Sequence, residues 1–316
     1  MKKFLILIVF VVGLNAKDNY GVSGFTFLKL PSGSARLQGL AGNGVSLVDG
    51  VDSFSINPAG VAFSQMREVS FSMIGWFEDY SGKYISYVEP HGTNVWGVSF
   101  GYYSADGFDV RDENGVAINA RDARFRNMVA NLVFAKSFFM ERFALGFAGK
   151  YVYEDRYLTE DSKFVWDGGA ILKLSRRIYL GFSKQNISGD KKKVVQITRY
   201  GGSFVLKRYL VVTLDNKKYS DSETKTGFGL EFILPEELLQ YGRFVFRLGY
   251  NDTINYGRNY DDSTLDKLGL SNTSGWSFGI GIYSTESLGR SYSIEYSLTP
   301  YGELGKTTQL TFKYKF

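Results

Sequence analysis

Residues 95–103, with the sequence VWGVSFGYY, decide the fold class of this chain. Alternate positions carry large apolar side chains, and the positions between them carry glycine or serine: Trp96, Val98, Phe100 and Tyr102 against Gly97, Ser99 and Gly101. A period of two is that of a β-strand, because successive side chains point to opposite faces. One large apolar face and one small or polar face is typical of a membrane-barrel strand, with lipid outside and the lumen inside.

The same alternation recurs along the rest of the chain, most clearly in residues 143–153, 244–250, 276–282 and 292–298. From Val69 onward it predicts fourteen strands, at 69–75, 83–90, 94–103, 127–137, 143–153, 164–174, 178–185, 197–206, 209–217, 225–234, 243–251, 274–284, 291–299 and 307–316. Bacterial single-chain barrels have an even number of strands. We therefore predict an all-β fold, a fourteen-stranded antiparallel transmembrane β-barrel over residues 67–316.

Short and long links alternate between the predicted strands. The links after the second, fourth, sixth and eighth strands are short: 92–93, 138–142, 175–177 and 207–208. The links after the third, fifth and eleventh strands are long and polar: 104–126, 154–163 and 252–273. Outer-membrane barrels have tight periplasmic turns and extended external loops. The pattern therefore predicts that both ends of the barrel chain lie in the periplasm.

Residues 1–16 have the features of a secretory signal peptide. Lys2 and Lys3 precede an apolar run from Phe4 to Val12, and Ala16 offers a small residue for cleavage. A membrane anchor is the competing interpretation, but a helix needs about 20 apolar residues to cross the hydrocarbon core. We predict a removed signal peptide and export to the cell outer membrane.

The composition excludes several kinds of site. The chain has no Cys and a single His, His91, so neither a Cys-ligated metal nor a multi-His metal site is expected. The net charge of +5 is too mild to argue for nucleic acid. Abundant Tyr, Phe and Gly (22, 26 and 36 residues) with only 5 Pro suit a barrel. We predict no cofactor, no metal and no nucleic-acid partner.

The chain ends in LTFKYKF, residues 310–316, in which apolar and polar residues alternate up to Phe316. This ending resembles the C-terminal signature that outer-membrane barrels present to the barrel-assembly machinery. The alternative is an ordinary edge strand, which would invite aggregation in a soluble protein. We predict the assembly machinery and outer-membrane lipid as partners.

Residues 17–66 precede the first strand and do not alternate. They include the small-residue stretches PSGSAR (31–36) and GLAGNG (39–44). Eight-stranded barrels fill their interior with side chains, whereas sixteen strands leave an aqueous channel. Fourteen strands lie between these limits, and the predicted lumen face is lined by Gly, Ser and Ala. We therefore predict that residues 17–66 form an N-terminal plug, or hatch, inside the barrel.

Several motifs in this segment follow one another in a recognisable order: FLKLP (27–31), SAR (34–36), LAG (40–42), the pair Asp49 and Asp52, and NPAG (57–60). The order resembles the start of PorV/PorQ-type proteins, which belong to the wider FadL-like group of fourteen-stranded outer-membrane barrels. Residues 246–250, FRLGY, resemble a strand pattern of that group. The chain departs from the family at Gly39-Leu40, where Met-Gly is common.

The resemblance implies a place and a role for the motif Asn57, Pro58, Ala59 and Gly60. In FadL-like proteins this box lies in a hatch inside the barrel, and the barrel admits long-chain fatty acids and other hydrophobic molecules. PorV-type relatives instead serve protein secretion as accessory or shuttle proteins. Physically, an Asn side chain can bind the local backbone while Pro fixes φ, and Gly60 is expected to relieve crowding against the wall. A structural turn and a ligand contact both stay open.

Five charged residues project into the predicted lumen: Lys150, Glu231, Arg247, Glu295 and Lys313. Because their strands are neighbours, Glu231–Arg247 and Glu295–Lys313 are candidate cross-strand ion pairs. One interpretation is that these charges hold plug and wall together, since unpaired interior charge is costly. The functional alternative is that a cation receives a carboxylate headgroup, for which Arg is well suited. The candidate ligand-binding residues are Arg247, Lys150 and Arg36.

Other constellations point away from catalysis. His91 lies beside a tight turn with no Gly-x-Ser-x-Gly elbow nearby, so we predict no enzyme. The Asp-rich stretch 259–266 lacks calcium-loop spacing and is interpreted as a solvated loop. Residues 191–193, three lysines, are either a solvated run or a contact with lipopolysaccharide.

Three functional hypotheses follow. The first is passive uptake of hydrophobic small molecules, of the long-chain fatty-acid kind, through a plugged barrel. The second is an accessory or shuttle role in a protein secretion system, with a secreted protein as partner. The third is a structural barrel without cargo.

Overall fold

The computed structural model describes residues 24–30, 33–76, 80–105, 111, 114–116, 125–156, 159–188, 193–206, 209–222, 224–234, 242–252, 275–285, 289–301 and 305–316. The predicted signal peptide at 1–16 lies outside these ranges, as do the Asp-rich stretch 259–266 and two of the three lysines at 191–193. Among the described residues, no helix combines the length and the apolar character that crossing a bilayer requires.

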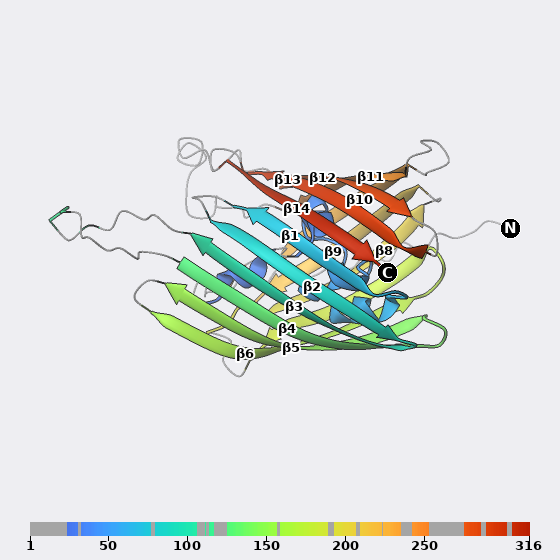
Figure 1. Cartoon of the computed structure of the whole chain (residues 1–316), viewed down its shortest axis with the longest axis horizontal. Coiled ribbons are helices and arrows are strands. Elements are labelled where there is room, and N and C mark those ends of the chain that lie inside the picture. Colours follow the sequence, from blue (N-terminus) through green and yellow to red (C-terminus); the bar gives the residue numbers. More distant parts are fainter. Residues whose placement is uncertain are drawn as a thin grey trace.

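Fourteen antiparallel strands form the wall of the molecule (Figure 1). Their bounds are β1 Glu68–Gly75, β2 Ser81–His91, β3 Asn94–Ala105, β4 Phe125–Phe138, β5 Phe143–Arg156, β6 Glu160–Lys173, β7 Ile178–Ile187, β8 Ile197–Leu206, β9 Leu210–Tyr219, β10 Lys225–Leu234, β11 Arg243–Asn251, β12 Trp276–Thr285, β13 Ser291–Pro300 and β14 Lys306–Lys315. The predicted number and order of strands are confirmed.

The sheet closes on itself, because β1 pairs with both β2 and β14. Glu68 at the start of β1 lies opposite Lys315 at the end of β14, so the barrel begins and ends at one rim. The short turns 92–93, 139–142 and 174–177 lie at that same rim. By the rule that short turns face the periplasm, this is the periplasmic rim.

One predicted loop is wrong. The ten-residue link expected at 154–163 is mostly strand, because β5 and β6 continue to pair as far as Asp155 opposite Glu160. The residues there are charged, so they lack the apolar alternation of a lipid-facing strand. Their backbone hydrogen bonds nevertheless extend the two strands beyond the apolar part of the wall.

The outer face of the wall carries a belt of exposed apolar side chains. Leu132, Phe134 and Phe147 are 61%, 53% and 54% exposed, while their neighbours Val133 and Ala148 are buried. This is the alternation predicted from the sequence. Only a closed barrel satisfies every strand hydrogen bond within lipid, so this fold with this belt is that of an outer-membrane barrel.

The chain ends on this outer face at the periplasmic rim. The backbone N–H of Phe316 donates to the carbonyl of Arg67 at 2.9 Å, and its ring stacks on Tyr314. Phe316 remains 40% exposed. A role for this ending in recognition by assembly machinery stays a prediction.

The described part of the N-terminal segment, residues 24–66, lies inside the barrel (Figure 1). It contains short helical elements: η1 Thr26–Lys29, α1 Ala35–Gly39, η2 Gly50–Ser55 and η3 Pro58–Phe63. Its backbone meets inward-facing side chains on strands far apart around the wall. For example, the N–H of Ala35 donates to Thr311 on β14, and the carbonyl of Ile56 accepts from Ser183 on β7.

Two apolar clusters hold this segment against strands β1 to β6. In the first, η2 and η3 pack on inward side chains of the middle and periplasmic part of the wall, such as Val88, Val133 and Ile171. In the second, nearer the external rim, Phe25 and Phe27 pack on Tyr84, Tyr103, Val129, Val152 and Val165. Fully burying one such side chain contributes about 1.5–3 kcal/mol, so these contacts dominate the attachment on this side.

Candidate functional site

The motif Asn57-Pro58-Ala59-Gly60 forms a capped turn against the wall. Asn57 caps η3 by accepting the N–H of Ala59 at 3.1 Å, and Pro58 occupies the first position of the helix. The Asn57 amide also donates to the carbonyls of Val45 at 2.8 Å and Ala170 on β6 at 3.3 Å. The predicted local turn is confirmed, and its side chain additionally ties two parts of the segment to the barrel.

Close approach of this turn to the wall depends on wall glycines. A Cβ at Gly146 on β5 would overlap the backbone of Pro58 and Ala59, and a Cβ at Gly169 on β6 would overlap the Asn57 amide. The expected role of Gly60 is wrong in this respect. A Cβ there would meet the Val48 carbonyl oxygen at 2.5 Å, within the segment itself. Gly60 therefore relieves crowding between η3 and the preceding turn, not against the wall.

A network of buried charges joins the segment to strands β10, β11, β13 and β14. Arg36 Nε lies 2.8 Å from Glu231, and Glu231 lies 2.8 Å from Arg247 Nε. Arg247 continues to Glu295 at 3.3 Å, and Glu295 to Lys313 at 2.8 Å. Lys313 also binds Asp52 of the N-terminal segment at 2.6 Å, so this series of contacts begins and ends on that segment. Asp52 also lies 3.5 Å from Arg36, so Glu231, Glu295 and Asp52 each have two cationic neighbours.

Both predicted cross-strand ion pairs are confirmed. Glu231 and Arg247 face each other in register. Lys313 lies opposite Ser293, two residues from Glu295, so the second pair is diagonal. Arg36 and Asp52 could not be assigned to this network from the sequence, because they lie in a segment without periodicity. In the sequence, Asp52 stands out only as part of a family-like motif.

A second polar anchor, missed by the sequence analysis, lies on β8, β9 and β11. The Asp215 carboxylate accepts the backbone N–H groups of Gly44 and Val45 at 2.6 and 2.8 Å. The Lys217 ammonium donates to the Ala41 carbonyl at 2.9 Å, and Arg199 donates to the Gly42 carbonyl at 3.2 Å. The sequence feature that could have revealed this anchor is the spacing of Asp215 and Lys217. They are two residues apart, so both charges lie on the inward face of one strand.

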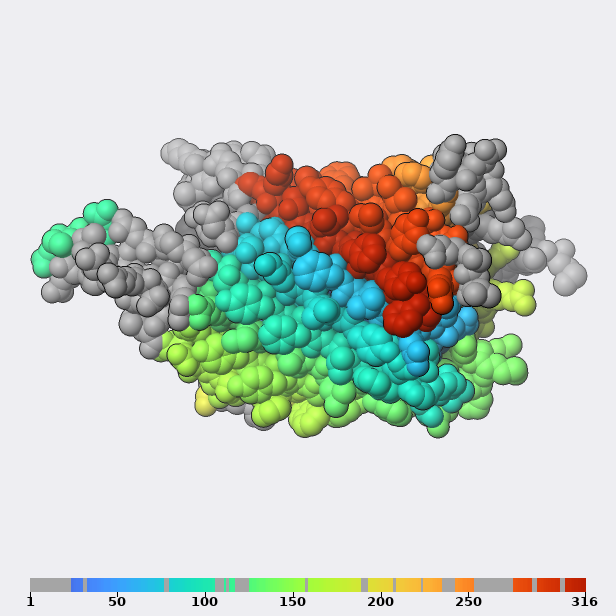
Figure 2. Space-filling model, in the orientation of Figure 1, coloured from blue at the N-terminus to red at the C-terminus, as the bar shows by residue number. Residues whose placement is uncertain are grey.

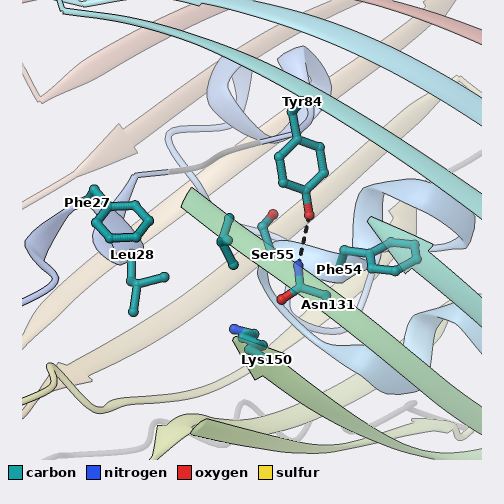
Figure 3. Close-up of a pocket in the computed structure, with 8 residues that line it drawn as sticks. Phe27, Leu28, Phe54, Ser55, Tyr84, Asn131 and Lys150 are labelled. Carbon is teal, nitrogen blue, oxygen red and sulfur yellow. Dashed lines mark hydrogen bonds between the residues drawn. The ribbon is translucent and has the colours of Figure 1, made fainter. Parts of the chain in front are cut away.

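Lys150 is buried in the wall, as predicted, beside a small cavity. Its ammonium lies 2.5 Å from Asp167 on β6 and donates to Asn186 at 3.1 Å. Asp167 sits where the pairing of β6 with β7 shifts register, between Trp166 and Gly168. The cavity measures about 20 Å³ and is lined by Phe27, Leu28, Phe54, Ser55, Tyr84, Val129, Asn131 and Lys150. Figure 3 shows the Tyr84 hydroxyl directed at Asn131, with Lys150 at one side of the space.

A larger cavity of about 340 Å³ opens beside the charge network, at the periplasmic rim. Its lining includes Glu68 and Lys315, at the first residue of β1 and the last of β14, together with Arg36 and Asp49. The Asp49 side chain is 44% exposed and binds Arg36 at 2.7 Å. Burial raises the pKa of this carboxyl, but the positive charges of Arg36, Lys315 and Lys313 and the hydrogen bond from Arg36 together outweigh burial and bring the pKa to about 2.

The remaining candidates do not form a reactive site. His91 is the exposed last residue of β2, as expected of a turn residue. Among the described residues, no group of three or more His, Cys, Asp and Glu side chains is placed to hold a metal ion. The candidate cations Arg36, Lys150 and Arg247 all lie inside the barrel, each with a carboxylate partner.

Comparison with solved structures shows which barrels share this fold. The chain is similar to the toluene transporter TbuX of Ralstonia pickettii, with 12% identity, a TM-score of 0.59, and coverage of 91% of this chain and 98% of that one. It is similar to the toluene transporter TodX of Pseudomonas putida, with 11% identity, a TM-score of 0.57 and coverage of 90% and 97%. A FadL homologue of Pseudomonas aeruginosa gives 11% identity, a TM-score of 0.53 and coverage of 91% and 98%.

At these identities the likeness establishes a common fold over nearly the whole of each chain. No protein-family model and no curated protein matches the sequence.

Proposed function

We propose that this barrel passively transports hydrophobic small molecules, of the long-chain fatty-acid kind, across the outer membrane. The observation that carries the proposal is the apolar cluster inside the external half of the lumen, where Phe25 and Phe27 pack on Tyr84, Tyr103 and Val129. A diffusion porin has a polar, water-filled interior. An apolar interior facing the external rim favours apolar solutes instead. The fold shared with toluene transporters and a FadL homologue supports this choice.

The two cavities suggest a route. A molecule entering past the apolar cluster would reach the cavity beside Lys150 and then the cavity at the periplasmic rim. The first measures only about 20 Å³, which is room for about one water molecule. A hydrocarbon therefore needs the N-terminal segment to shift. We propose that residues 17–66 act as a movable plug.

Of the three candidate ligand-binding cations, Lys150 is best placed to meet a carboxylate headgroup, because it alone lines the cavity beside the apolar cluster. Arg247 has no exposed side-chain surface and already binds two carboxylates. Arg36 is similarly engaged by Glu231 and Asp49. A fatty-acid carboxylate at Lys150 would replace Asp167 as the partner of the ammonium.

Native mass spectrometry with lipid extraction, on protein purified from outer membranes in a mild detergent, tests the transport proposal. We expect a fatty acid or similar hydrophobe in stoichiometric amount. The double variant Lys150→Met/Asp167→Asn, which leaves no unpaired charge, should lose it, whereas Arg247→Met should retain it. If Arg247→Met alone loses the bound molecule, the headgroup site lies in the charge network instead.

A second candidate is a PorV-like accessory or shuttle role in protein secretion. The observation that favours it is the filled lumen, in which the N-terminal segment is hydrogen-bonded to strands around the wall. In the same native mass spectra, a ligand-free barrel bound to another polypeptide would support this role and contradict transport. Ligand-free barrels without any bound polypeptide would favour the third hypothesis, a structural barrel without cargo.

A further inference from the structure

The turn between β4 and β5 has an unusual backbone. Three consecutive residues other than glycine, Phe139, Met140 and Glu141, have φ values of 53°, 54° and 62°. The left-handed region is costly for side chains with a Cβ and is rarely occupied by bulky residues. Three in succession are maintained only where the surroundings compensate for the strain.

This conformation holds two large apolar side chains away from the protein. Phe139 is 75% exposed and Met140 is 95% exposed, the highest value among the exposed large hydrophobic residues that the structure describes. In water, both the strain and the exposure would be unfavourable. The arrangement becomes favourable only if the two side chains enter a non-aqueous phase.

The lipid-facing belt runs directly into this turn. On the outer face of β4, Leu132 and Phe134 are followed by Lys136 and Phe138, and Phe139 comes next. The ammonium of Lys136 lies 5.6 Å from the centre of the Phe138 ring. The turn therefore extends a surface that already contacts lipid, at the rim assigned to the periplasm. In Figure 2 this rim is at the right, where the green atoms project beyond the wall.

Cations lie in the same turn as the two apolar side chains and in the turn next to it. Arg142 follows them, and Arg176 and Arg177 are exposed in the neighbouring turn after β6. The two turns are joined, because the N–H of Lys173 donates to the Arg142 carbonyl at 2.7 Å. In the part of the chain that the structure describes, Lys136, Arg142, Arg176 and Arg177 form no ion pair with a carboxylate. Glu141 is the one acidic residue of these two turns.

We propose that Lys136, Phe139, Met140, Arg142, Arg176 and Arg177 form a binding patch for anionic phospholipids of the periplasmic leaflet. Phe139 and Met140 enter the boundary between headgroups and acyl chains. The cations bind phosphate, as basic residues near an anionic lipid surface do. The patch is independent of the transport role, because none of its residues lies in the lumen.

A depth measurement tests the apolar half of this proposal. The chain has no Cys, so Met140→Cys can carry a single polarity-sensitive fluorophore. The matched control is Val116→Cys, another exposed apolar position, which lies beyond the external end of β3. In vesicles of phosphatidylethanolamine and phosphatidylglycerol, spin labels on lipid headgroups should quench the probe at 140 and leave the probe at 116 unaffected. Equal, water-like emission at both positions would overturn the proposal and favour a protein partner.

A lipid-retention measurement tests the charged half. Native mass spectrometry of wild-type protein should show phosphatidylglycerol retained in preference to phosphatidylethanolamine. In the triple variant Arg142→Gln/Arg176→Gln/Arg177→Gln, retention should fall by about fivefold for each charge removed. Lys83→Gln, which removes an exposed cation near the external rim, should leave retention unchanged. Equal retention of both lipids by the wild-type protein, or no change in the triple variant, would overturn the proposal.

Discussion

The two sides of the barrel hold the N-terminal segment in different ways. Strands β2 to β6 hold η2 and η3 by apolar packing and by glycines that admit the backbone of Pro58 and Ala59. Strands β10 to β14 hold Arg36 and Asp52 through a branched set of ion pairs beside a cavity of about 340 Å³. Apolar packing depends on how closely the two surfaces fit, whereas each buried ion pair depends on the presence of both partners and is screened little by salt. The two sides are therefore expected to respond to different substitutions: the packed side to changes of side-chain size and the charged side to removal of charges.

The comparison also distinguishes isolated from shared charges. Among the described residues, Lys150 and Asp167 on the packed side form a pair without a second ion, while Glu231 and Glu295 on the charged side each have two cations. Removing one member of an isolated buried pair leaves an uncompensated charge. Removing one member of a shared network leaves each of its former partners with another opposite charge.

The largest expected effect comes from the isolated pair. Lys150→Met should destabilise the protein by about 3–5 kcal/mol, because the buried Asp167 carboxylate loses its cation. The check is the free energy of unfolding from reversible urea titration in lipid vesicles. Lys150→Met/Asp167→Asn is the control and should recover most of the loss. An unchanged unfolding free energy for Lys150→Met would show that water already solvates Asp167.

The next effect tests the packing against η3. Gly169→Val should destabilise by about 1–3 kcal/mol, because its side chain would overlap Asn57. Gly168→Val is a matched control on the adjacent residue, where a Cβ would meet no atom within 4 Å. We expect protease cleavage within residues 24–66 to increase only in the Gly169 variant. Equal behaviour of the two variants would contradict the close packing of this turn.

A smaller effect is expected on the charged side. Arg247→Met should cost about 2 kcal/mol, less than Lys150→Met, because Glu231 retains Arg36 and Glu295 retains Lys313. The same urea titration measures both variants. If Arg247→Met proves the more damaging substitution, the network does not share its charges in the way described.

The smallest effect should come from Asp49, beside the cavity at the periplasmic rim. Arg36, together with Lys315 and Lys313, lowers the Asp49 pKa to about 2, so these charges stabilise the fold above about pH 4, the pKa expected in the unfolded chain. This contribution is lost as the pH falls through 2. Because the side chain is 44% exposed, the effect should be about 0.5 kcal/mol. Asp49→Asn should be less stable than wild type at neutral pH and equal to it near pH 2.

The strands of the wall could be predicted almost entirely from the sequence. Large apolar residues alternate with small or polar ones because one face of each strand contacts lipid and the other faces the lumen. The predicted segments 225–234 and 243–251 match β10 and β11 in both bounds. Where β5 and β6 extend beyond the apolar belt, that contrast disappears and Asp155 opposite Glu160 was missed. The pair Glu231–Arg247 was predictable because antiparallel neighbours fix which residues meet.

The contacts of the N-terminal segment could not be predicted in the same way. The segment has no period from which to infer a facing residue, so the partners of Arg36 and Asp52 required the folded structure. Gly60 illustrates the difficulty: its need for a small side chain was inferred, but the neighbour was Val48 in the same segment. The inward charges of β9 serve that segment, which explains why Asp215 and Lys217 were also missed.

The most direct test of the account is uptake by a barrel whose segment is locked to the wall. The hydroxyl oxygens of Ser46 and Ser203 lie 2.7 Å apart, so Ser46→Cys/Ser203→Cys can form a disulfide between segment and β8. The matched control, Ser70→Cys/Ser86→Cys, joins β1 to β2 within the wall, where the hydroxyls are 2.6 Å apart. Radiolabelled oleate entry into vesicles containing each oxidised variant is the measurement. We predict that the segment-to-wall disulfide stops uptake, that reduction restores it, and that the wall disulfide has no effect. Unchanged uptake through the locked barrel would contradict a movable plug.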